Sequence, residues 1–405
     1  MRGEVIEPPR LMTGAFLALA VAVLVYFIAD GMTLPVTPRY VAGPLAGDDV
    51  AVGVAIGAFS ATALILRPWA GRISDRRGRR PLILAGIALF ALGMLGHLVA
   101  TSLPVLVFMR LILGSGEAFL FVGALSAASD LAPEERRGEA ISLISLSLYL
   151  GVAVGPFIGE AILGDGRYAA VWVASAAIAG LAILLALRMP ETVSADQRRQ
   201  AIEDAGTPAQ RGLRAVVHPA GLLPGLVLLA STAGMGGYFS FTTRYATNDL
   251  GLDVSWPVFA LFAAIVIGFR SSMPWMPDRL GHRTAAYTAL IFDTIGLATI
   301  ALWATPVGLF VGTAIFAFGV CFAFPALSAM VTGSVPRAER GAALGTFSAF
   351  LDLAFGVGPV ALGVVATLAG YGPMYLVAAG IAAAGLGLLR LTRPRAAVIA
   401  GTADA

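Results

Sequence analysis

The sequence has little charge, one cysteine and no lysine. Only 13% of its 405 residues are charged, whereas a soluble domain carries about 25%. All 27 basic residues are arginines, so the Gly-Lys-Ser/Thr run of a phosphate loop is absent and nothing indicates that ATP drives the protein. The single cysteine, Cys321, lies in an apolar run, which excludes an intrachain disulfide and argues against redox chemistry. HExxH, CxxC and GxSxG patterns are also missing, which argues against a hydrolytic or metal-dependent enzyme.

Hydrophobic residues take the place of the missing charge. They make up 58% of the chain, and the mean hydropathy is +0.85. A membrane span needs about 20 apolar residues, so the composition predicts an all-α polytopic membrane protein with about twelve transmembrane helices. Breaks at charged and Pro/Gly-rich turns place these spans at about 11–38, 50–70, 82–101, 104–128, 140–163, 170–188, 220–243, 255–276, 284–304, 306–331, 343–367 and 374–391.

The arginines are distributed unevenly between alternate loops. With the N-terminus in the cytoplasm, 21 arginines fall on the cytoplasmic side and 3 outside (Arg39, Arg167 and Arg244). Three more, Arg67, Arg110 and Arg270, fall within the spans. By the positive-inside rule, this bias predicts that both termini and the middle loop are cytoplasmic.

The two halves of the chain repeat each other at an almost constant offset. Four anchors are separated by 203 residues, and two further pairs by 202 and 205 residues. We therefore predict two parallel six-helix repeats, 1–188 and 219–405, joined by a cytoplasmic linker at 189–218, with a substrate path between them. The pairs are Arg67 with Arg270, "DRRGRR" at 75–80 with "DRLGHR" at 278–283, "RG" at 137 with 340, "GP" at 155 with 358, "LSA" at 125 with 327, and "TPRY" at 37 with "TTRY" at 242.

Three motifs resemble those of the major facilitator superfamily. "GRISDRRGRRP" at 71–81 resembles the superfamily's loop between helices 2 and 3, through Gly71, Asp75, Arg76, Gly78, Arg79 and Arg80. "RLILGSGEA" at 110–118 resembles the fourth-helix motif of proton-coupled members. "GVAVGPFIGE" at 151–160 resembles the fifth-helix motif of drug–proton antiporters through Gly151, Gly155, Pro156 and Gly159, with Glu160 in place of a usual glycine. The resemblance implies a twelve-helix exporter of the sugar-efflux or multidrug type.

The charged loop at 71–81 has two interpretations. Its arginines anchor the topology, but an aspartate adds little to orientation, so Asp75 calls for another role. The resemblance implies that Asp75 meets the eleventh helix and that Arg79 pairs with Asp130. We expect Asp75, Arg79 and Asp130 to form a cytoplasmic gating latch that stabilises the outward-facing state; the alternative is a topology anchor alone.

Ionisable residues inside the predicted spans are the candidates for proton coupling, because charge at bilayer depth is costly and usually functional. Counting about 1.5 Å per residue puts Asp30 and Arg110 at a similar depth, with Glu117 nearer the midplane. We expect an Asp30–Arg110 pair with Glu117 below it; a static ion pair between the first and fourth spans is the alternative. Asp352 is a further coupling candidate, Asp293 a weaker one, and Glu160 is expected at the outer surface.

Aromatic residues on the first, fourth, seventh and tenth spans suggest a cavity for an apolar or amphipathic substrate, although each one is also a normal packing residue. The predicted cavity residues are Tyr26, Phe27, Phe119, Tyr238, Phe241, Phe318 and Phe322.

The sequence therefore predicts a secondary transporter of the bacterial inner membrane that exports a small organic molecule by proton antiport. We expect it to function as a monomer, with no cofactor or metal and no nucleic-acid partner. A facilitator or proton-coupled uptake symporter is the main alternative. A membrane enzyme and a transporter-like receptor are less well supported, because no catalytic motif and no long soluble segment is present.

Overall fold

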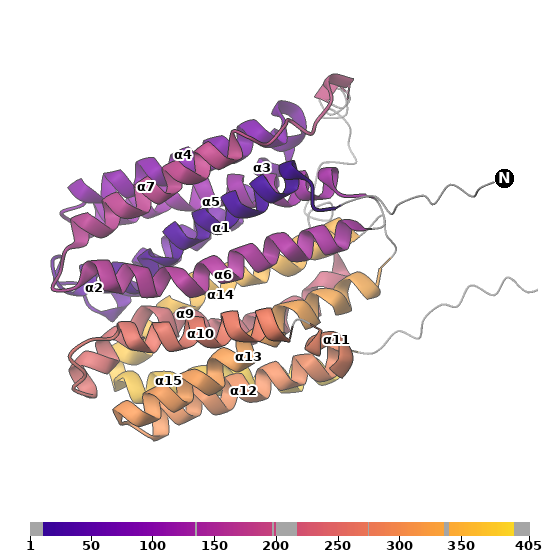
Figure 1. Ribbon diagram of the computed structural model, residues 1–405. Helices are drawn as coiled ribbons and strands as arrows, with labels where there is room; N and C mark the ends of the chain where they lie inside the picture. Colours follow the sequence, from indigo (N-terminus) through magenta and orange to yellow (C-terminus); the bar gives the residue numbers. More distant parts are fainter. Residues whose placement is uncertain are drawn as a thin grey trace, which may run out of the picture.

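Long helices lie side by side and cross the molecule from end to end (Figure 1). The computed structural model describes residues 11–133, 136–196, 198 and 199, 217–273, 275–335 and 340–392. Eleven of the described helices are long and apolar enough to span a membrane, and Trp256–Ser272 is a shorter apolar helix between two of them. The prediction of an all-helical, twelve-helix membrane protein is confirmed.

The helices form two groups, α1–α7 and α9–α15, which appear one above the other in Figure 1. Most of the predicted linker, 200–216 included, lies outside the described residues. The first group is α1 (Gly14–Gly31), α2 (Thr33–Ala42), α3 (Asp49–Arg77), α4 (Arg79–Gly96), α5 (Leu103–Leu131), α6 (Arg137–Leu163) and α7 (Tyr168–Ala186). The second group is α9 (Pro219–Arg244), α10 (Trp256–Ser272), α11 (Met276–Leu280), α12 (His282–Leu302), α13 (Pro306–Gly333), α14 (Arg340–Ala369) and α15 (Tyr371–Leu391).

Most spans differ from the prediction by a few residues at their ends, and three of them differ in a way that has a clear physical cause or changes the form of the helix. The first is broken into α1 and α2 at Met32, because Pro35 has no N–H to donate to the carbonyl of Gly31. The second extends to Arg77 instead of ending near residue 70, since arginines in a last helical turn are favoured by the helix dipole. The eighth ends at Ser272, and the separate short helix α11 follows it.

The two groups meet along two seams, α3 against α14 and α6 against α10. Glycines let α3 and α14 touch through their backbones. A Cβ built on Gly53 would lie 2.6 Å from Val360 Cα and 2.7 Å from the Pro359 carbonyl oxygen. One on Gly57 would lie 2.6 Å from the Gly356 carbonyl oxygen. Small residues at such contacts are typical of close helix packing in membranes.

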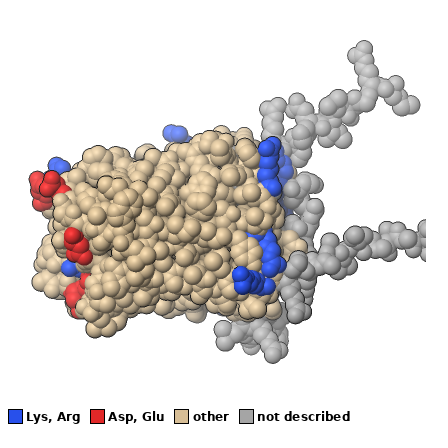
Figure 2. Space-filling view, turned by 90° about the horizontal axis from the view of Figure 1, so that it is seen from below, with Lys and Arg blue, Asp and Glu red and all other residues tan. Residues whose placement is uncertain are grey.

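The outer surface of the bundle fits a lipid environment. Large apolar side chains are exposed along it, with Leu368 80% and Leu302 73% exposed. On the face seen in Figure 2, most basic side chains gather at one end, beside the grey segments, while the acidic side chains lie at the opposite end together with a few basic ones. Most charged side chains on this face thus lie near its ends, as expected where charge at bilayer depth is costly.

Candidate functional site

Arg67 of α3 binds carboxylates from both groups of helices. Its Nη2 lies 2.8 Å from Asp352 Oδ1 of α14 and 3.2 Å from Glu117 Oε1 of α5. The guanidinium stands over the Phe121 ring at 4.4 Å, and Nη1 lies 3.5 Å from Ser348 Oγ. The side chains of Arg67, Glu117 and Asp352 are only 12%, 7% and 11% exposed. We call these three residues the central cluster.

The central cluster has one guanidinium for two carboxylates. Glu117 Oε2, Asp352 Oδ2 and Arg67 Nε are buried, and none of them has a hydrogen-bond partner among the described residues. Buried polar atoms normally have partners, and leaving one unpaired costs about 1–3 kcal/mol. The cluster therefore has unused capacity to bind a proton or a polar group. Sequence reasoning predicted Glu117 and Asp352 separately and did not assign Arg67 a role, although its place within a span and its repeat at Arg270 were a signal.

Arg110 lies close to Asp30 but does not form the expected ion pair with it. Its Nε donates to the Ala55 carbonyl at 3.2 Å, its Nη1 to Thr33 Oγ1 at 3.3 Å, and its Cζ stands 4.9 Å from the centre of the Phe59 ring. Among the described residues, Asp30 has no ion pair within 4.0 Å, although both side chains are buried. Asp30 and Arg110 are therefore close, as expected, but their side chains do not point at each other. The break after α1 places the Thr33 hydroxyl nearer to Arg110 than the Asp30 carboxylate.

The predicted latch residues lie around the turn between α3 and α4, with Asp75 in the last turn of α3, Arg79 at the start of α4 and Asp130 near the end of α5. Gly78 provides the turn, with φ 109°, and its repeat partner Gly281 has φ 79°. Both values lie in the region that favours glycine. Arg79 pairs with Asp75 and lies 3.1 Å from Asp130. Gly71 has open space around it, and Arg76 is exposed.

These loop contacts stay within the first group of helices. Asp75 is 54% exposed, and no hydrogen bond or ion pair from it to α14 is present in the described part of the chain. Arg79 makes a further link to the start of the predicted linker, since its backbone N–H donates to Glu191 at 2.9 Å. The structure thus brings Asp75, Arg79 and Asp130 together, and the described residues provide no hydrogen bond or ion pair from them to the second group of helices.

A second polar layer joins the two halves at the ends of the helices opposite the charged loop. Glu160 of α6 lies 2.9 Å from Arg39 and accepts hydrogen bonds from Thr243 and Ser255 of the second half, at 3.2 and 3.0 Å. We call the contacts of Glu160 and of Asp49 at this end of the molecule the outer layer. Sequence reasoning placed Glu160 at the outer surface, whereas the structure buries it to 4% exposure.

Asp49 makes the remaining contacts of the outer layer. It pairs with Arg244 of α9 and accepts a hydrogen bond from Tyr371 of α15 at 3.2 Å. Sequence reasoning missed Asp49. The repeated "PRY" and "TRY" runs were the available signal, because they contain Arg39 and Arg244, the two arginines of this layer. The outer layer closes the space between the halves at this end.

The glycines of the predicted fifth-helix motif lie against α1. A Cβ on Gly155 would lie 2.6 Å from Gly31 Cα, and one on Gly151 would lie 2.5 Å from Phe27 Cβ. Gly159 approaches the Met32 backbone in the same way, with its Cβ position 2.3 Å from the Met32 carbonyl oxygen. Pro156 belongs to this run and lies near Gly31. The motif therefore sets how closely α6 packs on α1, next to the break that follows Gly31.

The predicted cavity residues make contacts with other aromatic and small residues. Most of them pack inside their own half. The contacts are Tyr26 with Phe27 and Phe90, Phe119 near Gly86, Tyr238 with Phe239, Phe259, Phe262 and Phe316, Phe241 with Tyr371, and Phe318 and Phe322 with Phe269.

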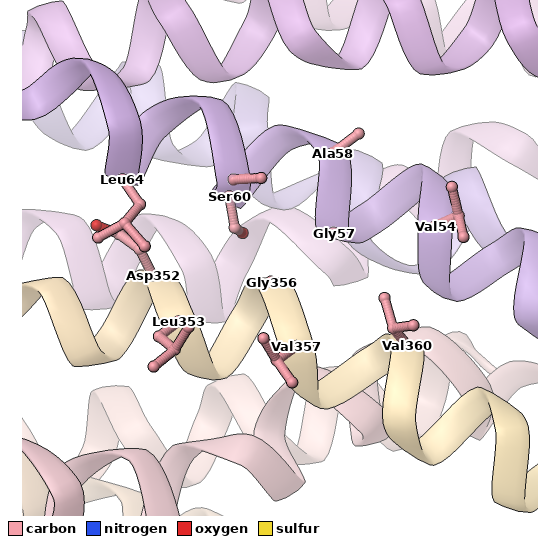
Figure 3. A pocket seen from close by; sticks show the side chains of 11 residues that line it. Val54, Gly57, Ala58, Ser60, Leu64, Asp352, Leu353, Gly356, Val357 and Val360 are labelled. Atoms are coloured by element: carbon pink, nitrogen blue, oxygen red, sulfur yellow. The ribbon is translucent and has the colours of Figure 1, made fainter.

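An apolar groove follows the α3–α14 seam (Figure 3). Val54 and Val357 line it and are 40% and 55% exposed, so the groove opens toward the surrounding lipid. Asp352 lies at one end, beside Leu64. Gly57 and Gly356, whose backbones approach each other closely, also line the groove.

Comparison with known proteins decides the family. The model described as Major Facilitator Superfamily matches residues 19–307 and 275–404. The chain belongs to the Major Facilitator Superfamily. An uncharacterized MFS-type transporter of Salmonella typhimurium is 31% identical over 386 residues, covering 92% of this chain and 95% of the relative. One of Burkholderia mallei is 31% identical over 396 residues, covering 94% and 92%. Membrane transport is thus the general function of this superfamily member.

Solved structures of superfamily members share the fold. The xylose transporter XylE from E. coli, in a partially occluded inward-open conformation, matches with a TM-score of 0.75 at 13% identity, covering 94% of this chain and 99% of that one. The human organic anion transporter MFSD10 matches with a TM-score of 0.71 at 19% identity, covering 94% and 100%. At these identities the likeness concerns the fold and leaves the substrate of this superfamily member open.

Proposed function

We propose that this superfamily member exports a small, apolar or amphipathic organic molecule by proton antiport, through alternating access between its two halves. The observation that carries the proposal is Arg67, which holds Glu117 of its own half and Asp352 of the other half at once. A group that binds protons and also spans the seam can link proton binding to the movement of the halves.

Charge counting supports the proposal that the central cluster binds a proton. With both carboxylates ionised, the cluster carries one net negative charge in a buried position, and burying uncompensated charge is costly. Binding one proton makes the cluster neutral. The free oxygens Glu117 Oε2 and Asp352 Oδ2 are available to take that proton without breaking the contacts to Arg67.

The same cluster restrains the empty carrier. When Asp352 is ionised, its attraction to Arg67 holds α14 against α3. Protonation of Asp352 removes its charge and weakens this bridge, so the two halves can reorient. An antiporter must prevent its empty, unprotonated form from alternating, because that step would dissipate the gradient. The Arg67–Asp352 bridge provides that restraint.

Support for export comes from the fifth-helix motif and its packing. Gly151, Gly155 and Gly159 hold α6 close to α1, and the motif resembles that of drug–proton antiporters. Asp30 and Arg110 lie on the helices next to this contact, and we propose them as a second site of the coupling path. Uptake by symport or facilitated diffusion remains the alternative, and the direction of proton flux separates the three.

We further propose that the protein lies in the bacterial inner membrane as a monomer, with its termini in the cytoplasm. The basic end of the molecule in Figure 2 supports this orientation, because positive charge favours the cytoplasmic side.

The test is proton flux in proteoliposomes carrying an imposed pH gradient, screened with dyes, sugars and amphipathic drugs. We expect a substrate to release protons from the acidic compartment through the wild-type protein and not through Glu117→Gln. Glu139→Gln is the matched control, because Glu139 is an exposed carboxylate at the start of α6, outside the central cluster. Equal flux through both variants, or substrate transport with no proton movement, would show the proposal to be wrong.

A further inference from the structure

Arg270 of α10 is a cation at the second seam for which the described residues provide no counter-ion. Its Nε and Nη2 are buried and have no hydrogen-bond partner among the described residues. Its Cζ stands 4.8 Å from the centre of the Tyr149 ring, which belongs to α6 of the other half. The Tyr149 hydroxyl is also buried without a partner.

The internal repeat shows what is missing at this place. An offset of 203 residues relates Arg67 to Arg270 and Tyr149 to Asp352. In the α3–α14 seam the arginine of one half meets the carboxylate of Asp352. In the α6–α10 seam the equivalent arginine meets the phenol of Tyr149, which brings no negative charge. The second seam therefore repeats the geometry of the first without its anion.

Leaving buried guanidinium nitrogens without an anion is costly, because they have lost the hydrogen bonds of water. The contact with the Tyr149 ring offsets only part of that cost. The guanidinium fork matches a carboxylate or phosphate in shape. The Tyr149 hydroxyl is a further donor beside it. Together the two side chains provide donors from both halves for one anionic group.

The surroundings of Arg270 and Tyr149 are apolar and aromatic. Tyr149 packs against Phe324 of α13 at 5.4 Å between ring centres, and Phe269, next to Arg270 in the chain, packs against Phe322 at 4.8 Å. Tyr149 lies twelve residues into α6, about 18 Å from that end of the helix. The unpaired cation thus lies deep in the molecule, beside rings that fit an apolar body.

We propose that Arg270 and Tyr149 bind the anionic group of the transported molecule, so that the substrate class is organic anions with an apolar or aromatic body. This inference rests on the proposed transport function and specifies its substrate. The bound anion takes the place at Arg270 that Asp352 takes at Arg67. Because it touches one residue from each half, its binding favours the conformations in which Arg270 and Tyr149 face each other.

The test is calorimetric binding of three compounds with one naphthalene body to the full chain in phosphatidylcholine nanodiscs: naphthoate, naphthylmethanol and naphthylmethylammonium. We expect naphthoate to bind most tightly, and Arg270→Gln to weaken it about 10- to 100-fold, as for loss of a charge-assisted hydrogen-bonded pair. Arg270→Lys keeps the charge and should lose less, and Tyr149→Phe should weaken binding about 3- to 10-fold. Arg72→Gln is the matched control, because Arg72 is exposed. Unchanged binding of naphthylmethanol by every variant shows that the site is folded.

Four results would overturn the assignment. Naphthoate binding equally to wild type and Arg270→Gln would remove Arg270 from the site. Tighter binding of naphthylmethylammonium would reverse the charge preference. If inorganic phosphate bound to the site as tightly as naphthoate does, the site would not require an apolar body in its ligand. Loss of naphthoate binding when phosphatidylglycerol replaces phosphatidylcholine would identify a lipid headgroup as the occupant.

Failure of the proposed transport function has a different signature. If Arg270-dependent naphthoate binding is present but no proton flux accompanies naphthoate transport, proton antiport is wrong and the anion site stands. If a panel compound drives Glu117-dependent proton flux while naphthoate binding does not depend on Arg270, the anion site is wrong and antiport stands.

Discussion

Gly53→Ala should move the transporter toward its outward-open state. The Cβ position at Gly53 lies 2.6 Å from Val360 Cα, 2.7 Å from the Pro359 carbonyl oxygen and 3.0 Å from the Pro359 carbonyl carbon. All three atoms are backbone, so no side-chain rotation can relieve the overlap. Ordinary contact begins at 3.4 Å, so α14 must retreat from α3 by about 0.8 Å. The overlap exists only when the seam is closed, so the added methyl group destabilises the closed state alone.

The size of the effect follows from the cost of overpacking. An extra methyl group in a close-packed contact typically costs about 1–3 kcal/mol. If only the closed seam bears this cost, the ratio of outward-open to closed molecules rises about 5- to 150-fold. The two halves themselves should keep their stability, because Gly53 contacts α14 of the opposite half.

The assay is the labelling rate of Ser60→Cys by a membrane-impermeant thiol reagent added from outside, in a Cys321→Ser background. Ser60 is 4% exposed and lies at the seam, so it should label slowly when the seam is closed and quickly when it opens. We expect Gly53→Ala to raise the rate about 5-fold or more.

Two glycine variants serve as controls for this prediction. Gly180→Ala should leave the labelling rate unchanged, because no atom lies within 4 Å of the added methyl group. Gly116→Ala clashes at 2.5 Å with Gly86 inside one half and should lower thermal stability without raising the rate. An unchanged rate in Gly53→Ala, in a protein of normal stability, would refute the argument that this backbone contact holds the outer end closed.

Three further substitutions test other parts of the structure. Glu160→Gln removes the negative charge that pairs with Arg39 in the outer layer. We expect the thiol reagent added from outside to label Ser60→Cys faster in this variant. An unchanged labelling rate would argue that the outer layer does not hold the two halves together. Gly155→Ala places a methyl group 2.6 Å from the Gly31 backbone and should destabilise the first half by about 1–3 kcal/mol, read as a lower midpoint of thermal unfolding. Gly78→Ala forces an alanine to φ 109° and ψ 160°, which essentially only glycine adopts, and places a methyl group against the Glu191 side chain. It should cost about 1–3 kcal/mol in the same assay, and an unchanged midpoint would argue that this turn does not need glycine.

The sequence was sufficient to predict the fold because hydrophobic length and loop charge are local properties. The twelve spans lie close to their predicted positions, and Gly78 and Gly281 both take the positive φ that a repeated tight turn requires. Where a proline or a charged last turn changed a helix, as at Pro35 and Arg77, the boundary moved by several residues.

The partners of the buried charges were harder to predict, because they depend on which helices meet across a seam. Glu117 and Asp352 were recognised as ionisable groups at membrane depth, but their common partner Arg67 depends on how α3, α5 and α14 pack. Arg110 was placed at the depth of Asp30, yet hydrogen-bonds to Thr33 instead. The depth of a residue in the membrane follows from counting residues along the helix. The direction in which its side chain points depends on how the helix is rotated and, here, on the break between α1 and α2.

The central claim is that protons on the central cluster control the alternation of the halves. The most direct measurement is the distance between spin labels on Asp165→Cys and Asp253→Cys, which are exposed on opposite halves, as the pH is lowered from about 9 to about 5. Protonation weakens the Arg67–Asp352 bridge, so the account predicts that the long-distance, outward-open population of the wild type rises as the pH falls. In Asp352→Asn, the open population should be larger and much less dependent on pH. A wild-type distance distribution that does not change with pH, or an Asp352→Asn variant that keeps the full wild-type response, would contradict the account.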